Sequence, residues 1–498
     1  MPADRHSVRD FPPAGAAPRI NTHAGKAAAL ALTACLALAL SGCALTPPGP
    51  APAPAAPAAW SAPLPSAATG DRAQALTQWW SQFDDSMLPQ LIEAAQRNHG
   101  SLAQAAARIA QARATARATG SRAWPSVDAG ARATRSATDV PIAQPAATMT
   151  GVGLDMLWEI DLFGVTRNSA AAAQARAEGA EYAWHELRVS LAADTAATLL
   201  GYRACEALVD VYTEDAASQG RAAELVGIKA QAGLDSPANA ALAAASAADA
   251  RNRLVAQRAE CDVQIKSLVA LTALPEQTLR AQLTPRRALL PQPASFAVDT
   301  VPARLLMQRP DLAALEREVL AASGDVGAAQ ADRYPRLSLA GTVSLASVQS
   351  GVSGTNWSIG PALSLPLFDA GRRAAQVDVA QARYDEAMAR YTQRARDAVR
   401  EVEEALVRLD AATRREADAL AAADGFRRYF AAAQARFDVG AESLLDLESA
   451  RRNALLAAAT LVGVQRERVA AWITLYRAVG GGWLPDAAAP ATQALAKD

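Results

Sequence analysis

The sequence feature that most constrains the fold is a helical pattern of unusual length. From Arg373 to Phe437 the chain contains no proline. Small or apolar residues recur every seven positions, at Val377, Tyr384, Tyr391, Ala398, Ala405 and Ala412, with a second series at Met388, Ala395, Val402 and Leu409. This heptad seam is typical of a coiled coil, and roughly 65 helical residues extend about 100 Å. Asn168 to Ala232 has a similar length and composition. The sequence therefore predicts an elongated, mainly helical molecule.

Four shorter segments alternate between apolar and polar residues. The clear ones place apolar side chains at Val152, Leu154, Met156, Trp158 and Ile160, at Leu337, Leu339, Val343 and Leu345, and at Trp357, Ile359, Leu363, Leu365 and Leu367. The fourth, from Pro125 to about Thr138, is weaker and mostly alanine. A period of two predicts strands with one apolar and one polar face. Soluble sandwiches share this pattern, but strands of about ten residues in an exported chain favour a transmembrane β-barrel. The stretches Ala137–Ala147 and Ala346–Thr355 are then expected to be extracellular loops.

The chain is internally duplicated, with an offset of about 207 to 210 residues. Leu102 to Pro125 matches Leu312 to Pro335, and Leu162-Phe163-Gly164 matches Leu367-Phe368-Asp369. We expect two repeats of one helix, two strands and a long helical hairpin, at residues 71–295 and 296–484. Four strands cannot close a barrel, and an open edge in lipid leaves backbone groups unpaired. Two copies would give eight strands and a filled interior, whereas three would give twelve and a pore.

The N-terminus carries the signature of an exported lipoprotein. Lys26 precedes an apolar run from Ala27 to Leu40, which is followed by Ser41-Gly42-Cys43. We interpret residues 1–42 as a signal peptide and Cys43 as the lipidated N-terminus; the alternative is a buried cysteine after a short core helix. Residues 43–70 are rich in proline and alanine, which predicts an extended tether that lifts the body off the lipid. Residues 485–498 are expected to be a disordered tail.

Charge and motif content exclude several functions. Lys plus Arg number 49 against 50 Asp plus Glu, so the basic surplus of a nucleic-acid-binding protein is missing. The histidines have no metal-ligand spacing, and neither a catalytic triad nor a phosphate loop is present. We therefore predict no enzyme activity, no cofactor and no metal site.

Each long helix is expected to end at a glycine and to turn back as a second helix. The turns are Gly233-Leu234-Asp235-Ser236 and Gly440-Ala441-Glu442-Ser443. Glycine supplies a left-handed C-cap, and the polar residues after it can cap the next helix. These two hairpin tips would form the end of the molecule farthest from the membrane.

Two cysteines lie at equal sequence distance from the first turn. Cys205 and Cys261 flank Gly233 symmetrically, so antiparallel helices would place them at one height. The compartment reached by export is oxidising, which favours a disulfide. Two separate buried thiols remain the alternative.

Two motifs resemble those of a known family. They are Arg436-Phe-Asp-Val-Gly-Ala-Glu-Ser-Leu-Leu-Asp446 at the second tip and Leu475-Tyr-Arg-Ala-Val-Gly-Gly-Gly-Trp483 near the end. With them the chain resembles the TolC/OprM family of outer-membrane efflux factors, especially its lipidated NodT-type branch, over roughly residues 75–485. The resemblance implies a homotrimer with a twelve-stranded membrane barrel over a helical tunnel, anchored in outer-membrane lipid and extending into the periplasm. It also implies a passive exit duct that takes drugs, toxic small molecules or metal ions from an inner-membrane transporter, of the RND type or another, through a periplasmic membrane-fusion adaptor.

By the same resemblance, the tips carry the adaptor-docking surface and the closed aperture. The docking candidates are Gly233, Leu234, Asp235, Ser236, Arg436, Gly440, Ala441 and Ser443, and the aperture candidates are Phe437, Glu442, Asp446 and Glu448. Phe437 occupies the position of an aromatic gate residue and Asp446 that of a ring acid. Glu442 replaces a basic gate residue, and Glu448 lies beside the second acidic position. Three copies of a carboxylate on a narrow axis would attract cations. Alternatively, Asp446 only caps a helix.

Two other functions fit part of the pattern. The same fold could serve as a duct for polypeptide secretion. A trimeric structural stalk or adhesin also uses long coiled coils, but it would not need two repeats with returning helices.

Overall fold

The computed structural model describes residues 48–53, 56–65, 76, 79–138, 144–293, 295, 302–348, 351 and 353–483. The predicted signal peptide, the lipidation site Cys43 and the tail at 485–498 lie outside this part of the chain. The elements, in order, are η1 (Trp79–Gln82), α3 (Met87–Asn98), α4 (Gly100–Gly120), η2 (Ser121–Ala123), β1 (Ser126–Thr138), β2 (Gln144–Ile160), α5 (Val165–Gln231), α6 (Pro237–Thr272), α7 (Glu276–Leu283), η3 (Thr284–Arg286), α8 (Pro302–Leu306), α9 (Pro310–Ala331), β3 (Arg336–Val348), β4 (Ser353–Ser364), α10 (Arg372–Asp438) and α11 (Leu444–Ala478).

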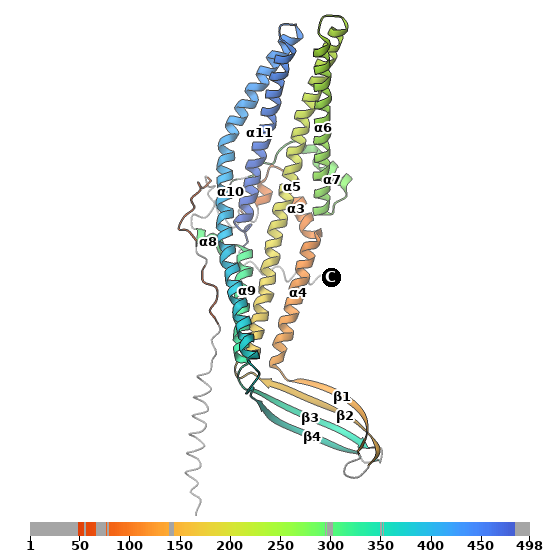
Figure 1. Ribbon diagram of the computed structural model, residues 1–498, viewed down its shortest axis with the longest axis vertical. Coiled ribbons are helices and arrows are strands. Elements are labelled where there is room, and N and C mark those ends of the chain that lie inside the picture. The colour runs from red at the N-terminus through yellow and green to blue at the C-terminus, as the bar shows by residue number, and fades with distance from the viewer. Residues whose placement is uncertain are drawn as a thin grey trace, which may run out of the picture.

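The molecule is long, with a sheet at one end and two helical hairpin tips at the other (Figure 1). Helices α5 and α10 each contain 67 residues, which confirms both predicted long helices. The heptad seam of α10 is buried where it meets its neighbours, at Tyr391, Ala395, Ala398, Val402, Ala405, Leu409 and Ala412. Among the described helices, none is both long enough and apolar enough to cross a membrane.

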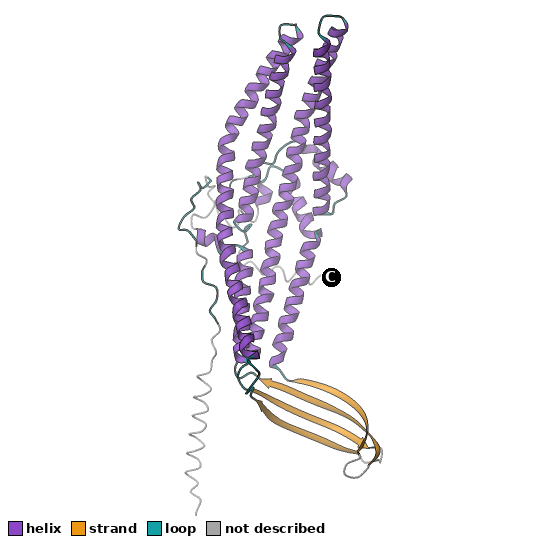
Figure 2. Ribbon diagram, in the orientation of Figure 1, coloured by secondary structure: helices purple, strands orange, loops and turns teal. Residues whose placement is uncertain are grey.

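The order of elements occurs twice. The series α4-β1-β2-α5-α6 is followed by α9-β3-β4-α10-α11, as the duplication predicts. In each half, the long helix pairs with the returning one, so that α5 packs against α6 and α10 against α11 (Figure 2). The second half then packs on the first, because α9 lies against α5 and α11 also contacts α5.

The four strands form one antiparallel sheet in the order β1-β2-β3-β4. Its register puts apolar residues opposite each other, as with Leu154 and Val343, and polar residues likewise, as with Asp155 and Thr342. The predicted alternation is confirmed, but the predicted loops are too long. The ladder continues to the pair Thr138–Gln144, and β3 extends to Val348. Backbone pairing prolongs these strands beyond the point at which their side chains stop alternating.

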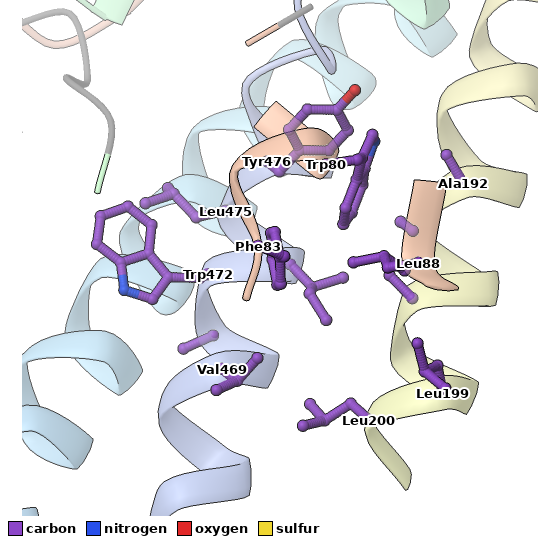
Figure 3. Packing of buried hydrophobic residues seen from close by; sticks show 14 of the residues in the cluster. Trp80, Phe83, Leu88, Ala192, Leu199, Leu200, Val469, Trp472, Leu475 and Tyr476 are labelled. Carbon is purple, nitrogen blue, oxygen red and sulfur yellow. The ribbon is translucent and has the colours of Figure 1, made fainter. Parts of the chain in front are cut away.

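An aromatic core joins the N-terminal segment to both halves at mid-height (Figure 3). Trp79 is fully buried, and its ring stacks on that of Tyr476 with 4.9 Å between centroids. The Trp80 and Phe83 rings pack around the same tyrosine and tryptophan. Trp79 and Trp80 are therefore packing anchors, as their position before Phe83 suggests.

The described parts of the proline-rich N-terminal segment contain neither helix nor strand, and they contact the helical body. The Ser323 hydroxyl donates to the Pro48 carbonyl oxygen at 2.5 Å, and the Tyr384 hydroxyl to that of Gly49 at 3.1 Å. Farther along, the Glu403 carboxylate accepts hydrogen bonds from the backbone N–H groups of Ser61 (2.7 Å) and Ala62 (2.9 Å). Residues 48–65 therefore lie against the helical body through hydrogen bonds and through apolar contacts of Ala51 and Ala56, and the tether that lifts the body off the lipid stays a prediction.

Candidate functional site

The two hairpin tips have the same backbone construction. Gly233 and Gly440 have positive φ angles of 73° and 77°, as expected for left-handed helix C-caps. In each tip the next residue closes the turn: Leu234 N–H donates to the Lys229 carbonyl at 2.8 Å, and Ala441 N–H to the Arg436 carbonyl at 2.8 Å. Both glycines therefore end their helices by capping carbonyl groups that would otherwise lack partners.

Serine starts the returning helix in both tips. The Ser236 hydroxyl accepts a hydrogen bond from Asn239 N–H at 3.1 Å, and the Ser443 hydroxyl accepts one from Asp446 N–H at 3.1 Å. Serine N-caps satisfy a backbone donor in the first helical turn, which has no partner within the helix. The two serines, which are 207 positions apart, are thus equivalent N-caps in the two repeats.

Large apolar side chains are exposed at these tips. Leu234 and Val439 are each 79 % exposed, and Leu445 is 67 % exposed. Apolar groups gathered at one end of a molecule mark a surface that another protein can cover. The docking candidates Gly233, Leu234, Asp235, Ser236, Gly440, Ala441 and Ser443 lie in or beside these turns, which are at the ends of the hairpins in Figure 1.

The position of Phe437 differs from that of a gate residue. Its side chain is only 4 % exposed and packs with Val226 of α5, Leu444 and Leu447. The Lys229 ammonium lies 5.1 Å from the ring centroid. In the single chain Phe437 therefore packs between the two hairpins, and its assignment as an aperture aromatic stays a prediction.

Two of the acidic aperture candidates are paired with arginines. Glu442 forms an ion pair with Arg436, and Glu448 forms one with Arg451. Glu448 also accepts a hydrogen bond from Gln219 Nε2 at 3.0 Å. Opposite charges in contact cancel most of the field that either would exert on a passing ion. Glu442 and Glu448 therefore supply little net charge, and Arg436 belongs to the fold of its own tip.

Asp446 is an exposed acid of the second tip. Its carboxylate accepts a hydrogen bond from the Ser443 hydroxyl at 2.6 Å, which fits the capping alternative. In the described part of the chain it has no Lys or Arg within ion-pair distance, and its side chain is open to solvent. Asp446 lies in the first turn of α11 and leaves a carboxylate charge at the tip.

A polar link between the two hairpins was not predicted from the sequence. The Arg451 guanidinium, 3 % exposed, donates to the Gln219 amide oxygen at 3.1 Å and so joins α11 to α5. The spacing of Glu448 and Arg451, three positions apart on one helix, could have indicated their pairing. The hydrogen bonds that Gln219 forms with this pair could not be inferred, because Gln219 lies far away in the sequence, in the other repeat.

The first hairpin contains the disulfide that the sequence suggests. Cys205 and Cys261 are bonded, with 5.5 Å between their Cα atoms and a sequence separation of 56. The bond joins α5 to α6, and both cysteines belong to the main hydrophobic core. It closes a long loop of chain and so restricts the unfolded state.

We expect both cysteines to be oxidised in the exported protein. Replacing both by serine should lower the stability of the α5–α6 hairpin by about 2–4 kcal/mol, because the unfolded chain regains the freedom of the closed loop. Mass spectrometry of non-reduced peptides should detect the linked pair. Free thiols at both positions would contradict the pairing.

The sheet contributes a second polar surface. Its hollow face encloses about 520 Å³ and carries Arg132, Thr134, Asp155, Thr342, Ser344 and Asn356. The opposite face exposes apolar residues such as Leu154, Trp357 and Ile359. Within the described ranges, no group of three or more His, Cys, Asp or Glu side chains is arranged to hold a metal ion.

Comparison with known proteins identifies the family. The chain matches the outer membrane efflux protein family over residues 91–274 and 301–481. It is 30% identical to the outer membrane protein OprJ of Pseudomonas aeruginosa over 81% of this chain and 86% of that protein. It is 29% identical to the toluene efflux pump outer membrane protein TtgI of Pseudomonas putida, over 82% of this chain and 88% of TtgI. The solved outer-membrane channel OprN superposes with a TM-score of 0.77 at 28% identity, covering 89% of this chain and 98% of that one.

The chain therefore belongs to the outer membrane efflux protein family, as the tip and C-terminal motifs suggest. It is an outer-membrane channel that serves as the exit duct of an efflux pump, a class of protein that works with an adaptor and an inner-membrane transporter. The family consists of ducts, which is consistent with a protein that is not an enzyme.

Proposed function

We propose that three copies of the chain form the duct. Strands β1 and β4 each pair on one side only among the described strands, so both edges of the sheet are open. An open edge in lipid leaves backbone N–H and C=O groups unpaired, at several kcal/mol each. Copies joined edge to edge remove this cost, and three of them enclose a twelve-stranded pore with the polar hollow face inside.

The proposed lipid anchor fits the path of the N-terminal segment. Pro48 is held at Ser323, eight residues before the end of α9 at Ala331, which is about 12 Å along the helix. The five residue steps from Cys43 to Pro48 can span up to about 17 Å. A diacylglycerol on Cys43 can therefore reach the level at which the helices end and the strands begin, which is where the lipid headgroups would lie.

The cargo we propose is small toxic organic molecules. TtgI is named as a toluene efflux pump protein and SrpC as a solvent efflux pump protein, which supports an apolar cargo. The exposed apolar residues at the tips support docking of a periplasmic membrane-fusion adaptor, with an RND-type transporter behind it. The observation that carries the proposal is the family match, which spans both repeats. It is supported by the sheet, whose two edge strands each lack a partner on one side among the described strands.

A deletion strain tests this function. Without the gene, cells should become more susceptible to solvents, dyes and detergents, and the intact gene should restore resistance. Unchanged susceptibility with loss of a secreted polypeptide would support a secretion duct instead. Unchanged susceptibility with loss of attachment would support a stalk.

Substitutions of the acidic residues at the tip should change the ion selectivity of the channel by different amounts. In planar bilayers, Asp446→Asn should reduce the preference of the channel for cations several-fold, because each copy loses one unpaired charge near the axis. Glu448→Gln, which removes a carboxylate already paired with Arg451, should change selectivity much less. Equal effects of the two substitutions would contradict the assignment of Asp446 as the aperture acid.

A further inference from the structure

The two helical hairpins form a pocket between the mid-height core and the tips. Side chains of α5, α10 and α11 line this hairpin pocket, and its volume is about 710 Å³. On one side of it the main core reaches Val209 of α5 and Leu409 of α10, and on the other a second apolar cluster begins at Val226 and Ala433. The hairpins are therefore packed together at both ends of a stretch in which they leave space. Sites of roughly 300–1,000 Å³ hold drug-sized organic molecules.

Small side chains account for the space. Five of the residues that line the hairpin pocket are alanines, namely Ala417, Ala421 and Ala423 of α10 and Ala454 and Ala458 of α11. Larger apolar residues such as Leu420 and Leu455 complete the walls, and Leu420 remains 56 % exposed. The apolar part of a ligand gains free energy by leaving water for such walls.

A buried carboxylate in the wall of the pocket has an unused oxygen. Asp215 of α5 is one of the lining residues, and its side chain is only 4 % exposed. Its Oδ2 accepts a hydrogen bond from Arg253 of α6 at 3.0 Å, whereas its Oδ1 has no hydrogen-bond partner among the described residues. A buried carboxylate oxygen without a hydrogen bond is costly. A ligand that donates a hydrogen bond to Oδ1 removes this cost.

Charges in and around the pocket leave an excess of acid. The charged lining residues are three acids and two bases, Glu214, Asp215, Asp424, Arg427 and Arg451. Both bases are already paired, Arg427 with Asp424 at 2.5 Å and Arg451 with Glu448. Arg253, the partner of Asp215, is shared with a second carboxylate, that of Asp249. In the part of the chain that the structure describes, Glu214 is exposed and has no Lys or Arg within ion-pair distance.

We propose that the hairpin pocket binds an organic cation. Its apolar body would lie against the alanines and leucines, and an N–H group would donate to Asp215 Oδ1. The adjacent Glu214 carboxylate would favour a positive charge over a negative one at the mouth of the pocket. One bound molecule would contact α5 of the first repeat and both α10 and α11 of the second, and so would join the two hairpins. The site is complete within one chain, so the inference does not rest on the proposed ring or on its cargo.

Fluorescence polarisation of proflavine tests the site in the full-length protein, placed in nanodiscs of phosphatidylcholine. Proflavine is a planar aromatic cation with amino groups, and zwitterionic lipid does not attract it by charge. We expect saturable binding of proflavine and much weaker binding of the anionic dye anilinonaphthalene sulfonate. No saturable binding of proflavine, or equal binding of the anionic dye, would overturn the proposal.

The contribution of the buried carboxylate can be measured with a matched pair of variants. Asp215→Asn should weaken proflavine binding about ten- to a hundred-fold, as expected for loss of a hydrogen bond to a charged acceptor. The control is Asp249→Asn, which removes the other partner of Arg253 at a site that is 59 % exposed and does not line the pocket. It should change the affinity less than about two-fold. Equal effects of the two substitutions would show that only net charge matters, and the proposed hydrogen bond would be wrong.

Salt separates the buried acid from the exposed one. Glu214→Gln should weaken binding about two- to five-fold at low ionic strength, and this difference should disappear near about 1 M salt, where exposed charges are screened. The effect of Asp215→Asn should persist, because its carboxylate is buried. If high salt removed both effects, the dye would be held at the surface and not in the pocket.

Filling the pocket tests its shape while every charge stays in place. Ala458→Phe should abolish proflavine binding, and an unchanged midpoint of thermal unfolding would show that the variant folds. Unchanged affinity in this variant would place the dye elsewhere and overturn the proposal. If the parent protein bound no dye and Ala458→Phe altered its oligomeric state in size-exclusion chromatography, a second copy would be the occupant, and the proposal would again be wrong. The susceptibility of the deletion strain is independent of these outcomes, so the duct function is judged separately.

Discussion

Replacing Asp85 by alanine should lower the free energy of unfolding by about 3–5 kcal/mol. The side chains of Asp85 and Arg203 are fully buried and form an ion pair at 3.1 Å. Arg203 also donates to the Leu283 carbonyl at 2.6 Å, so it joins α5 to the end of α7. Without Asp85, its guanidinium would remain in the core as an uncompensated charge. Denaturant unfolding followed by the fluorescence of the neighbouring tryptophans would measure the loss.

A double variant shows whether the loss of stability comes from the unpaired charge or from the altered packing of the site. Asp85→Asn combined with Arg203→Met should cost less than the sum of the single changes, because no unpaired charge remains. The matched surface pair is Arg427 and Asp424, whose side chains are 76% and 41% exposed. Asp424→Ala should change stability by less than about 1 kcal/mol. If Asp85→Ala and Asp424→Ala lowered the free energy of unfolding by similar amounts, burial would not be what makes the Asp85–Arg203 pair important for stability.

The periodic elements of this fold were predictable because their patterns are long. A heptad seam continued from Tyr391 to Ala412 has few alternatives to a long helix, and the glycines at the two tips mark where such helices must turn. Alternation in β2, β3 and β4 set the faces of the sheet correctly. The strand ends were less predictable, because Gln144 and Thr138 pair through their backbones and their side chains carry no signal for it.

The position of the tip could be predicted from the sequence, but the contacts of its side chains could not. The motif located the tip, and the cap at Ser443 follows from its spacing to Asp446. The burial of Phe437 was not predictable, because an aromatic side chain at the end of a helix can face either a pore or a neighbouring hairpin, and its packing against Val226 is visible only in the structure. Sequence alone cannot show that Gln219 and Arg451 neutralise Glu448, since the contact depends on how the two halves pack.

The N-terminal segment illustrates a different limit. Its proline content argues against helix and strand, and the described residues 48–65 contain neither, but composition does not say what such a segment lies against. The hydrogen bonds from Ser323 and Tyr384, and the acceptance of two backbone N–H groups by Glu403, are single contacts without any periodic pattern. Contacts of this kind can only be read from three-dimensional structure.

Gly480→Ala should be at least as damaging as the loss of the buried ion pair. Gly480 has a φ angle of +89°, where a side chain is strained, and a Cβ there would lie 2.4 Å from the Gln308 carbonyl oxygen. The backbone conformation alone costs on the order of 1–3 kcal/mol, and a clash with a backbone atom cannot be relieved by rotating a side chain. We expect a total loss of more than about 3 kcal/mol in denaturant unfolding.

The matched control is Gly463→Ala on helix α11, where an added Cβ meets nothing within 4 Å. That change should be neutral or stabilise the chain by up to about 1 kcal/mol, since alanine favours a helix more than glycine does.

The difference between the two glycine variants should also be visible in cells. The turn at Gly480 lies beside Arg309, which donates to the Ala478 carbonyl at 2.7 Å and joins the end of α11 to the start of α9. Displacing this joint should loosen the second repeat, so Gly480→Ala cells should contain less folded channel and should be more susceptible to solvents, whereas Gly463→Ala cells should match the parent. Equal resistance of the two strains would show that the joint is dispensable.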